Sequence, residues 1–189
     1  MIKRLIGIIV LLVVGLSAAG QEPAPANPPQ EGRQELSQKG YDRIVKEARH
    51  ELVMLPFYGV FDNLTYSVTP DGTVTLTGQV SRPTLKSDAE NVVKKIEGVE
   101  KVVNNIEVLP VSSVDDRIRR ATYRAIYGNT VLNQYALRAV PPIHIIVNRG
   151  HVTLEGVVAR QMDKQVAEIQ AKSVSGVFSV TNNLRVENR

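Results

Sequence analysis

Histidines, carboxylates and hydroxyl groups are the side chains that could catalyse a reaction or hold a metal in this 189-residue chain, which has no cysteine. A hydrolase needs a nucleophile with a base beside it, and a metal enzyme needs converging His, Cys or carboxylate ligands. The three histidines are His50, His144 and His151. The turn at residues 148–150 suggests a hairpin register that places His144 and His151 on opposite sheet faces, and no carboxylate pair recurs. We therefore expect no enzyme, no metal site, no cofactor and no small-molecule substrate.

Arginine and tyrosine side chains on one predicted helix are the best candidates for binding. They share its outer surface at helical spacing: Arg117, Arg119, Arg120, Tyr123, Arg124 and Tyr127. Guanidinium groups pair with phosphate oxygens, and tyrosine suits the headgroup boundary of a membrane because its ring is apolar and its hydroxyl is polar. The pattern indicates a surface for anionic phospholipid, and an ordinary solvated helix face is an equally good interpretation.

The same helix must also have a face that packs on a core. Its apolar residues at helical spacing predict that face: Val114, Ile118, Ala121 and Ala125. Asp115 and Asp116 weaken the positive charge locally, and their expected role is a favourable position near the helix N-terminus.

An internal repeat organises the rest of the chain. Residues 71–108 align with residues 149–186 at a constant offset of 78, and 17 of the 38 aligned positions are identical. Upstream, residues 42–44 match residues 116–118 at an offset of 74, which places about four extra residues of the second copy within 128–142. Such self-similarity indicates a duplicated structural unit.

Each copy has the same pattern of expected elements. A helical stripe comes first, and two alternating strands follow around a Pro-Asp-Gly or Asn-Arg-Gly turn. A second helix ends at Gly98 or Gly176 in a left-handed cap, and a third strand completes the unit. We predict an α+β fold of two tandem α-β-β-α-β modules, each a three-stranded mixed sheet covered by two helices.

Two repeated polar or small positions have structural explanations. Gly78 and Gly156 occupy the same point of the central strand, where a missing side chain would let a helix or a neighbouring backbone approach. Asn104-Asn105 and Asn182-Asn183 recur at the third strand, and one amide of each pair is expected to bond to backbone there.

The N-terminal residues predict export. Lys3 and Arg4 precede about a dozen apolar residues, and small residues follow at 17–20, which is typical of a cleavable signal peptide over residues 1–20. An uncleaved anchor is the alternative. Because the sequence lacks cysteine, a lipoprotein anchor is excluded. Proline-rich residues 21–36 are expected to be a linker, followed by modules over 37–110 and 111–189.

Positive charge is concentrated in the second copy. Residues 41–110 contain 8 basic and 10 acidic residues, whereas residues 111–189 contain 11 basic and 6 acidic ones. A positive surface on the second module favours an anionic partner.

The repeated motif Gly-x-Val-x-Leu-x-Gly-x-Val, followed by a helix and then Gly-Val-x-x-Val-x-Asn, resembles the BON domain family. The resemblance extends from residue 41 to residue 186. It implies a periplasmic or envelope protein without catalytic activity, associated with phospholipid binding, outer-membrane integrity and osmotic or other envelope stress.

Two functions therefore remain in competition. One is binding of anionic phospholipid surfaces through the second module, and the other is a periplasmic protein-interaction or chaperone-like role toward envelope proteins. Nucleic acid is not an expected partner, because the Gly-x-x-Gly clamp of KH-like modules is missing and export separates the chain from nucleic acid.

Overall fold

The computed structural model of the chain describes residues 36–138 and 140–187. The predicted leader (1–20) and all but the last residue of the predicted linker (21–36) lie outside the described residues. Every described residue belongs to one compact unit, Gln34–Arg189. Among these residues, no helix has both the length and the apolar character needed to cross a membrane.

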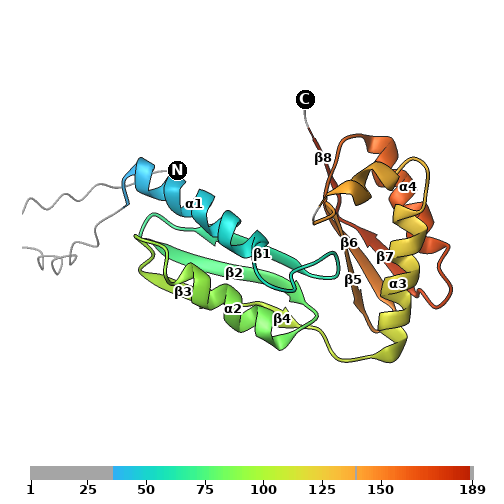
Figure 1. The fold of residues 1–189 in the computed structure, drawn as a ribbon, viewed down its shortest axis with the longest axis horizontal. Coiled ribbons are helices and arrows are strands. Elements are labelled where there is room, and N and C mark those ends of the chain that lie inside the picture. Colours follow the sequence, from blue (N-terminus) through green and yellow to red (C-terminus); the bar gives the residue numbers. More distant parts are fainter. Residues whose placement is uncertain (1–35, 139, 188–189) are drawn as a thin grey trace, which may run out of the picture. The chain divides into compact units, whose positions relative to one another are not determined.

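The first half of this unit consists of a helix, a hairpin, a second helix and a broken third strand (Figure 1). These elements are α1 (Gln38–Val53), β1 (Asn63–Val68), β2 (Thr73–Val80), α2 (Pro83–Val93), β3 (Lys101–Asn104) and β4 (Glu107–Val108).

The second half repeats the order with one addition. Its elements are α3 (Ser113–Tyr127), the 3-10 helix η1 (Asn133–Leu137), β5 (Ile143–Asn148), β6 (His151–Val158), α4 (Gln161–Lys172), β7 (Ser179–Asn182) and β8 (Arg185–Val186). The predicted α+β fold of two α-β-β-α-β modules is confirmed. The added η1 lies in the segment 128–142 predicted to hold the insertion. The module boundaries at 37–110 and 111–189 stay a prediction.

Each sheet is mixed and centred on the second strand of the hairpin. In the first module β2 pairs antiparallel with β1 and parallel with both β3 and β4. The third strand is broken because the Asn104 side chain intervenes: its Oδ1 accepts from the Ile106 N–H at 3.2 Å and its Nδ2 donates to the Lys86 carbonyl at 2.9 Å. Asn182 makes the corresponding bonds in the second module. The expected bonding of this amide to backbone is confirmed.

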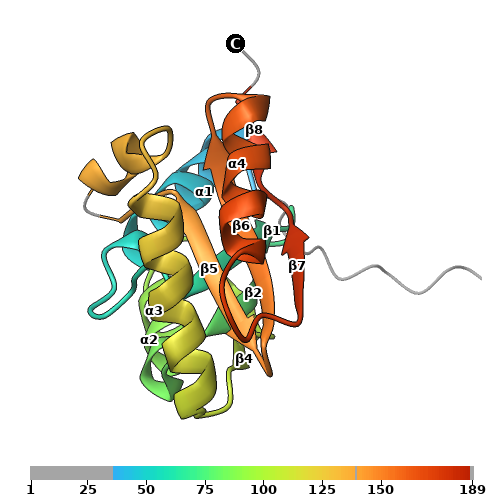
Figure 2. The ribbon, with the colours of Figure 1, turned by 90° about the vertical axis from the view of Figure 1, so that its right-hand side faces the viewer.

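Separate apolar cores hold the two modules. In the first, Ile44 of α1, Leu76 of β2 and Ala89 of α2 are fully buried together. In the second, α3 and α4 lie side by side over one face of the sheet (Figure 2), and Ile118 and Leu154 are among the residues buried between them. Two helices therefore cover each sheet, as predicted.

The repeated glycines of β2 and β6 are required by their neighbours. Gly156 has φ of +120°, and a Cβ atom there would lie 1.9 Å from the Pro142 carbonyl oxygen. At Gly78, with φ of +116°, the corresponding distance to the Asn63 oxygen is 2.1 Å. A side chain is excluded at both positions because the adjacent backbone fills the space.

Candidate functional site

Helix α3 carries the predicted binding residues, and its buried face differs from the predicted one. The residues that it buries are Asp115, Ile118, Arg119, Thr122, Ile126 and Tyr127. Val114 is 50% exposed, whereas Ala121 and Ala125 are half-buried. The predicted core face was therefore wrong except at Ile118, because three buried positions of the helix, Asp115, Arg119 and Thr122, are polar and do not show in an apolar pattern.

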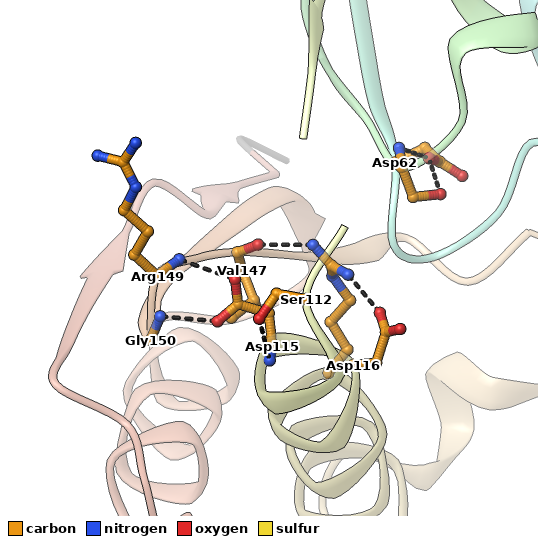
Figure 3. A network of polar contacts seen from close by, with 9 residues as sticks. Asp62, Ser112, Asp115, Asp116, Val147, Arg149 and Gly150 are labelled. Atoms are coloured by element: carbon orange, nitrogen blue, oxygen red, sulfur yellow. Dashed lines mark hydrogen bonds and ion pairs between the residues drawn. The ribbon is translucent and has the colours of Figure 1, made fainter. Parts of the chain in front are cut away.

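Asp115 is buried because it bonds to a turn far along the sequence. Its two carboxylate oxygens accept from the N–H groups of Arg149 and Gly150, each at 2.9 Å (Figure 3). Arg149 has φ of 51°, a left-handed conformation that is unusual for a residue other than glycine. The carboxylate satisfies the two turn N–H groups and so joins the start of α3 to the hairpin of β5 and β6.

Arg119 is a structural residue. Its guanidinium donates to the Val147 carbonyl at 2.7 Å and pairs with Asp116, and the residue is 5% exposed. The prediction that Arg119 belongs to the outer binding surface was wrong, because the strand β5 supplies a carbonyl that holds its charged group against the sheet.

Tyr127 also points inward. Its hydroxyl donates to the Ile143 carbonyl at 2.6 Å and accepts from the Ile143 N–H at 3.1 Å. Burial raises the pKa of Tyr127. Its predicted place on the outer surface was wrong as well. Tyr123 is half-buried, with its ring centroid 4.8 Å from that of Tyr127.

The remaining arginines of α3 are exposed, and two of them line a pocket. Arg117, Arg120 and Arg124 are all exposed. Arg120 and Arg124 lie with Tyr123 in the wall of a pocket of about 550 Å³. Arg117 does not line it. The structure thus brings together half of the predicted residues, while Arg119 and Tyr127 are buried in the module.

Two further segments complete the pocket. The segment after α3 contributes Ala136, Arg138 and Pro141, and the segment before β1 contributes residues 59–61. Arg138 is exposed, and it was missing from the predicted site. It is the only charged residue in 128–142, and this was the one signal in the sequence that could have pointed to it.

The segment 59–61 is held in place from both modules. The buried Asp62 accepts from the Gly59 N–H at 3.2 Å and from the Ser81 N–H at 2.6 Å. On the other side, the Val60 carbonyl accepts from the Ile145 N–H at 2.7 Å, and the Phe61 ring contacts Tyr123 at 6.2 Å between centroids. The first module therefore supplies one wall of a pocket whose arginines belong to the second.

The pocket is strongly positive. Among the described residues that line it there are three arginines and no carboxylate. Guanidinium groups remain charged at every physiological pH, and a concave surface lined by one sign of charge concentrates the field that attracts the opposite sign. The arrangement can bind an anion, and phosphate oxygens match its forked donors best.

The histidines do not converge. In the hairpin of β5 and β6, His144 pairs with Glu155 and Asn148 pairs with His151. His151 and Glu155 are four residues apart on β6 and therefore point to the same face, so the two histidines lie on one sheet face at opposite ends of the hairpin. The prediction of opposite faces was wrong, because cross-strand partners point to the same side. Burial lowers the pKa of His144, whose ring centroid lies 5.7 Å from that of Tyr58. Over residues 36–138 and 140–187, no three His, Asp or Glu side chains gather as metal ligands.

A model of the BON domain matches residues 59–110 and 129–188, which together are more than half of the chain. The chain belongs to the BON domain family, with two copies of the domain in tandem. Each match begins after the first helix of its module, so α1 and α3 precede the matched segments. Recognition of this family from the repeated glycine-valine motif is confirmed.

Solved structures give a more distant likeness. The C-terminal domain of CdsD, described as the structural protein of the type III secretion system of Chlamydia trachomatis, is 11% identical, with 77% of this chain and 98% of that chain covered and a TM-score of 0.30. A second structure of CdsD is 11% identical with a TM-score of 0.27, over 76% of this chain and 92% of that one. No curated protein matches this chain.

Proposed function

We propose that this chain is a non-enzymatic protein of the bacterial envelope that binds anionic phospholipid surfaces through its second BON module. The observation that carries the proposal is the set of exposed arginines on and beside α3, which are Arg117, Arg120, Arg124 and Arg138. BON membership suggests a periplasmic or envelope-associated protein. The excess of basic residues in 111–189 favours an anionic partner.

The number of arginines is sufficient for reversible attachment. Each basic residue near an anionic leaflet contributes about 1 kcal/mol. Four such residues hold a small domain at a membrane surface without a spanning segment, and salt weakens the attraction because the charges are exposed. Half-buried Tyr123 adds an amphipathic ring beside the arginines, suited to the headgroup boundary.

Sedimentation with vesicles tests this proposal. Residues 21–189, which lack the apolar leader, should sediment with vesicles of phosphatidylglycerol and phosphatidylcholine and stay in solution with phosphatidylcholine alone. Arg120→Glu combined with Arg124→Glu should abolish sedimentation. The matched control is Lys39→Glu with Lys46→Glu, which makes the same charge change at two exposed residues of α1. Equal sedimentation of both double variants and the unchanged protein would contradict the proposal.

We propose that the protein is exported, because residues 1–20 have the pattern of a cleavable signal peptide. The protein recovered from a periplasmic extract should begin at Gln21, as measured by intact mass. A chain that retains these residues and stays with the inner membrane would instead support an uncleaved anchor. Either result leaves the vesicle experiment interpretable, because that experiment uses residues 21–189.

Binding of envelope proteins is the second candidate. Phe178 is 83% exposed immediately before β7, and its ring centroid is 5.9 Å from that of His151. Exposed aromatic side chains are typical of protein-binding surfaces. If the chain suppresses aggregation of an unfolded client while vesicles never bring it down, this second function replaces the first. Phe178→Ser should then reduce that suppression.

A further inference from the structure

Three arginines line the pocket of about 550 Å³ beside α3. Within the described part of the chain, the guanidinium groups of Arg120, Arg124 and Arg138 have no ion-pair or hydrogen-bond partner. Other arginines do: Arg43 pairs with Glu97 and Arg160 with Asp163. Donors that line one pocket without an internal acceptor are available to a ligand.

The three arginines come from two segments that line the same pocket. Arg120 and Arg124 are one helical turn apart on α3, and Arg138 follows η1. Arginines that line one pocket can together give more hydrogen bonds to a single phosphate than three separate surface charges would give. Arg117, on the same helix, lies outside this space.

The pocket also depends on the first module. Phe61 lines it and contacts the ring of Tyr123, and Val60 is fixed by the hydrogen bond from the Ile145 N–H. The rings of Phe61 and Tyr123 form an apolar part of the pocket lining, and less polar surroundings strengthen the attraction to an anion. One module alone would leave the pocket open on one side.

An exposed apolar side chain adjoins the pocket in sequence. Leu137 lies between the lining residues Ala136 and Arg138 and is 89% exposed. A large apolar side chain is costly to leave in water and gains by entering the acyl boundary of a membrane. This position favours a phosphate that belongs to a lipid over a phosphate free in solution.

We propose that the pocket is a specific site for the phosphate of one phospholipid headgroup, bound by Arg120, Arg124 and Arg138 and walled by both modules. This inference rests on the proposed function, and it goes further because it replaces general attraction to a charged surface with recognition in one pocket. Loss of any one of the three guanidinium groups then removes direct hydrogen bonds to the ligand as well as a charge.

Single variants separate the pocket from the general charge. The equilibrium affinity of residues 21–189 for vesicles of phosphatidylglycerol and phosphatidylcholine is measured for Arg120→Gln, Arg124→Gln and Arg138→Gln. Each should weaken binding roughly 30-fold, because hydrogen bonds to a charged group are lost. The matched control Arg117→Gln makes the same charge change on the same helix and should weaken binding about fivefold at most.

An uncharged variant is a second measurement. Ala136→Gln fills part of the pocket without changing the charge and should weaken binding about tenfold or more, since it displaces the hydrogen-bonded headgroup. Thermal unfolding followed by circular dichroism verifies that each variant keeps its fold. Free glycerol phosphate and inorganic phosphate are added as competitors at millimolar concentration.

Each outcome has one meaning. Selective loss in the pocket variants, with little competition from free phosphate, supports the inference. Equal weakening by all four arginine variants, with no effect of Ala136→Gln, overturns the pocket and leaves general lipid binding intact. Displacement by free phosphate at low concentration overturns the choice of a lipid as ligand. Absence of vesicle binding by the unchanged protein overturns the proposed function and the pocket together.

Discussion

Asp115 on α3 and Gly150 in the turn between β5 and β6 are joined by a hydrogen bond of 2.9 Å, although 35 positions separate them in the sequence. The same carboxylate also accepts from the Arg149 N–H. The residue is 2% exposed, so the loss of these bonds would leave two turn N–H groups without an acceptor. The first module has Tyr41 at the corresponding position, so this connection belongs to the second module alone.

Asp115→Ala should lower the free energy of unfolding by about 3 kcal/mol, because it leaves buried donors unsatisfied. Urea unfolding followed by circular dichroism measures the change. Asp42→Ala is the control, since Asp42 is an exposed carboxylate near the start of α1 that bonds to Gln38. A loss no larger than that of the control would show that the turn does not depend on Asp115.

Arg119 and Arg120 are neighbours in sequence, but we expect substitution of Arg119 to reduce mainly the stability and substitution of Arg120 to reduce mainly the binding of vesicles. Arg119→Ala should cost about 2 kcal/mol of stability, because it leaves the buried Val147 carbonyl without its donor. Arg120→Ala should change stability by less than about 0.5 kcal/mol, as exposed positions do, and should weaken vesicle binding. The two free energies of unfolding and the two vesicle affinities are measured in parallel. A large loss of stability in Arg120→Ala, together with none in Arg119→Ala, would refute the burial of Arg119.

Asp163 and Tyr135 form a buried pair that has no counterpart in the first module. The Tyr135 hydroxyl donates to Asp163 Oδ2 at 2.7 Å and accepts from the Ala159 N–H at 2.8 Å. The position aligned with Asp163 is Leu85, which is equally buried. Burial raises the pKa of Asp163, but hydrogen bonds from Arg160 and Tyr135 lower it by more, so the net pKa is below its ordinary value.

Tyr135→Phe should therefore destabilise the protein by about 2 kcal/mol, because Asp163 loses a donor and the Ala159 N–H loses its acceptor. Adding Asp163→Leu, the residue of the first module, should restore part of that loss, since an apolar side chain needs no partner. A double-mutant cycle in urea measures the coupling. Strict additivity of the two substitutions would contradict the pairing.

Glu90 and Glu168 should make the free energy of unfolding depend on pH in the acidic range. Hydrogen bonds from Lys94 and Asn104 lower the pKa of Glu90, and those from Lys172 and Asn182 lower the pKa of Glu168. A lowered folded-state pKa adds stability that is complete above the ordinary value of 4.5 and is lost as the pH falls through the lowered value.

The urea midpoint should accordingly fall as the pH drops below about 4.5, and less steeply in the double variant Glu90→Gln with Glu168→Gln. Glu47→Gln serves as the control, because Glu47 is exposed on α1. A profile that is as steep in the double variant as in the unchanged protein would exclude the two glutamates as its cause.

Local patterns predicted the fold well. The alternation around Leu76, the turn glycine Gly72 and the helical spacing that includes Ala89 depend on neighbours in sequence, so the hairpin and the second helix could be expected. A third strand was expected as well, but its break at Asn104 was not. Because the unit is duplicated, each element expected in one copy could be compared with the same positions of the other copy. The family could be recognised for the same reason.

The site was harder to predict because its residues depend on contacts between distant segments. Arg119 matches an outward helix stripe in sequence, and only the Val147 carbonyl of β5 explains why it turns inward. Arg138 stands alone in an irregular segment, where no periodic pattern marks it. Phe61 belongs to the other module and could not be assigned to the pocket from its sequence position.

The decisive measurement is the affinity of residues 21–189 for vesicles as the phosphatidylglycerol fraction and the salt concentration are varied. We predict that binding requires phosphatidylglycerol, weakens as salt is added, and is lost in Arg120→Glu with Arg124→Glu while Lys39→Glu with Lys46→Glu retains it. Binding that is as strong to pure phosphatidylcholine, or that survives reversal of the two α3 arginines, would contradict lipid recognition by the second module.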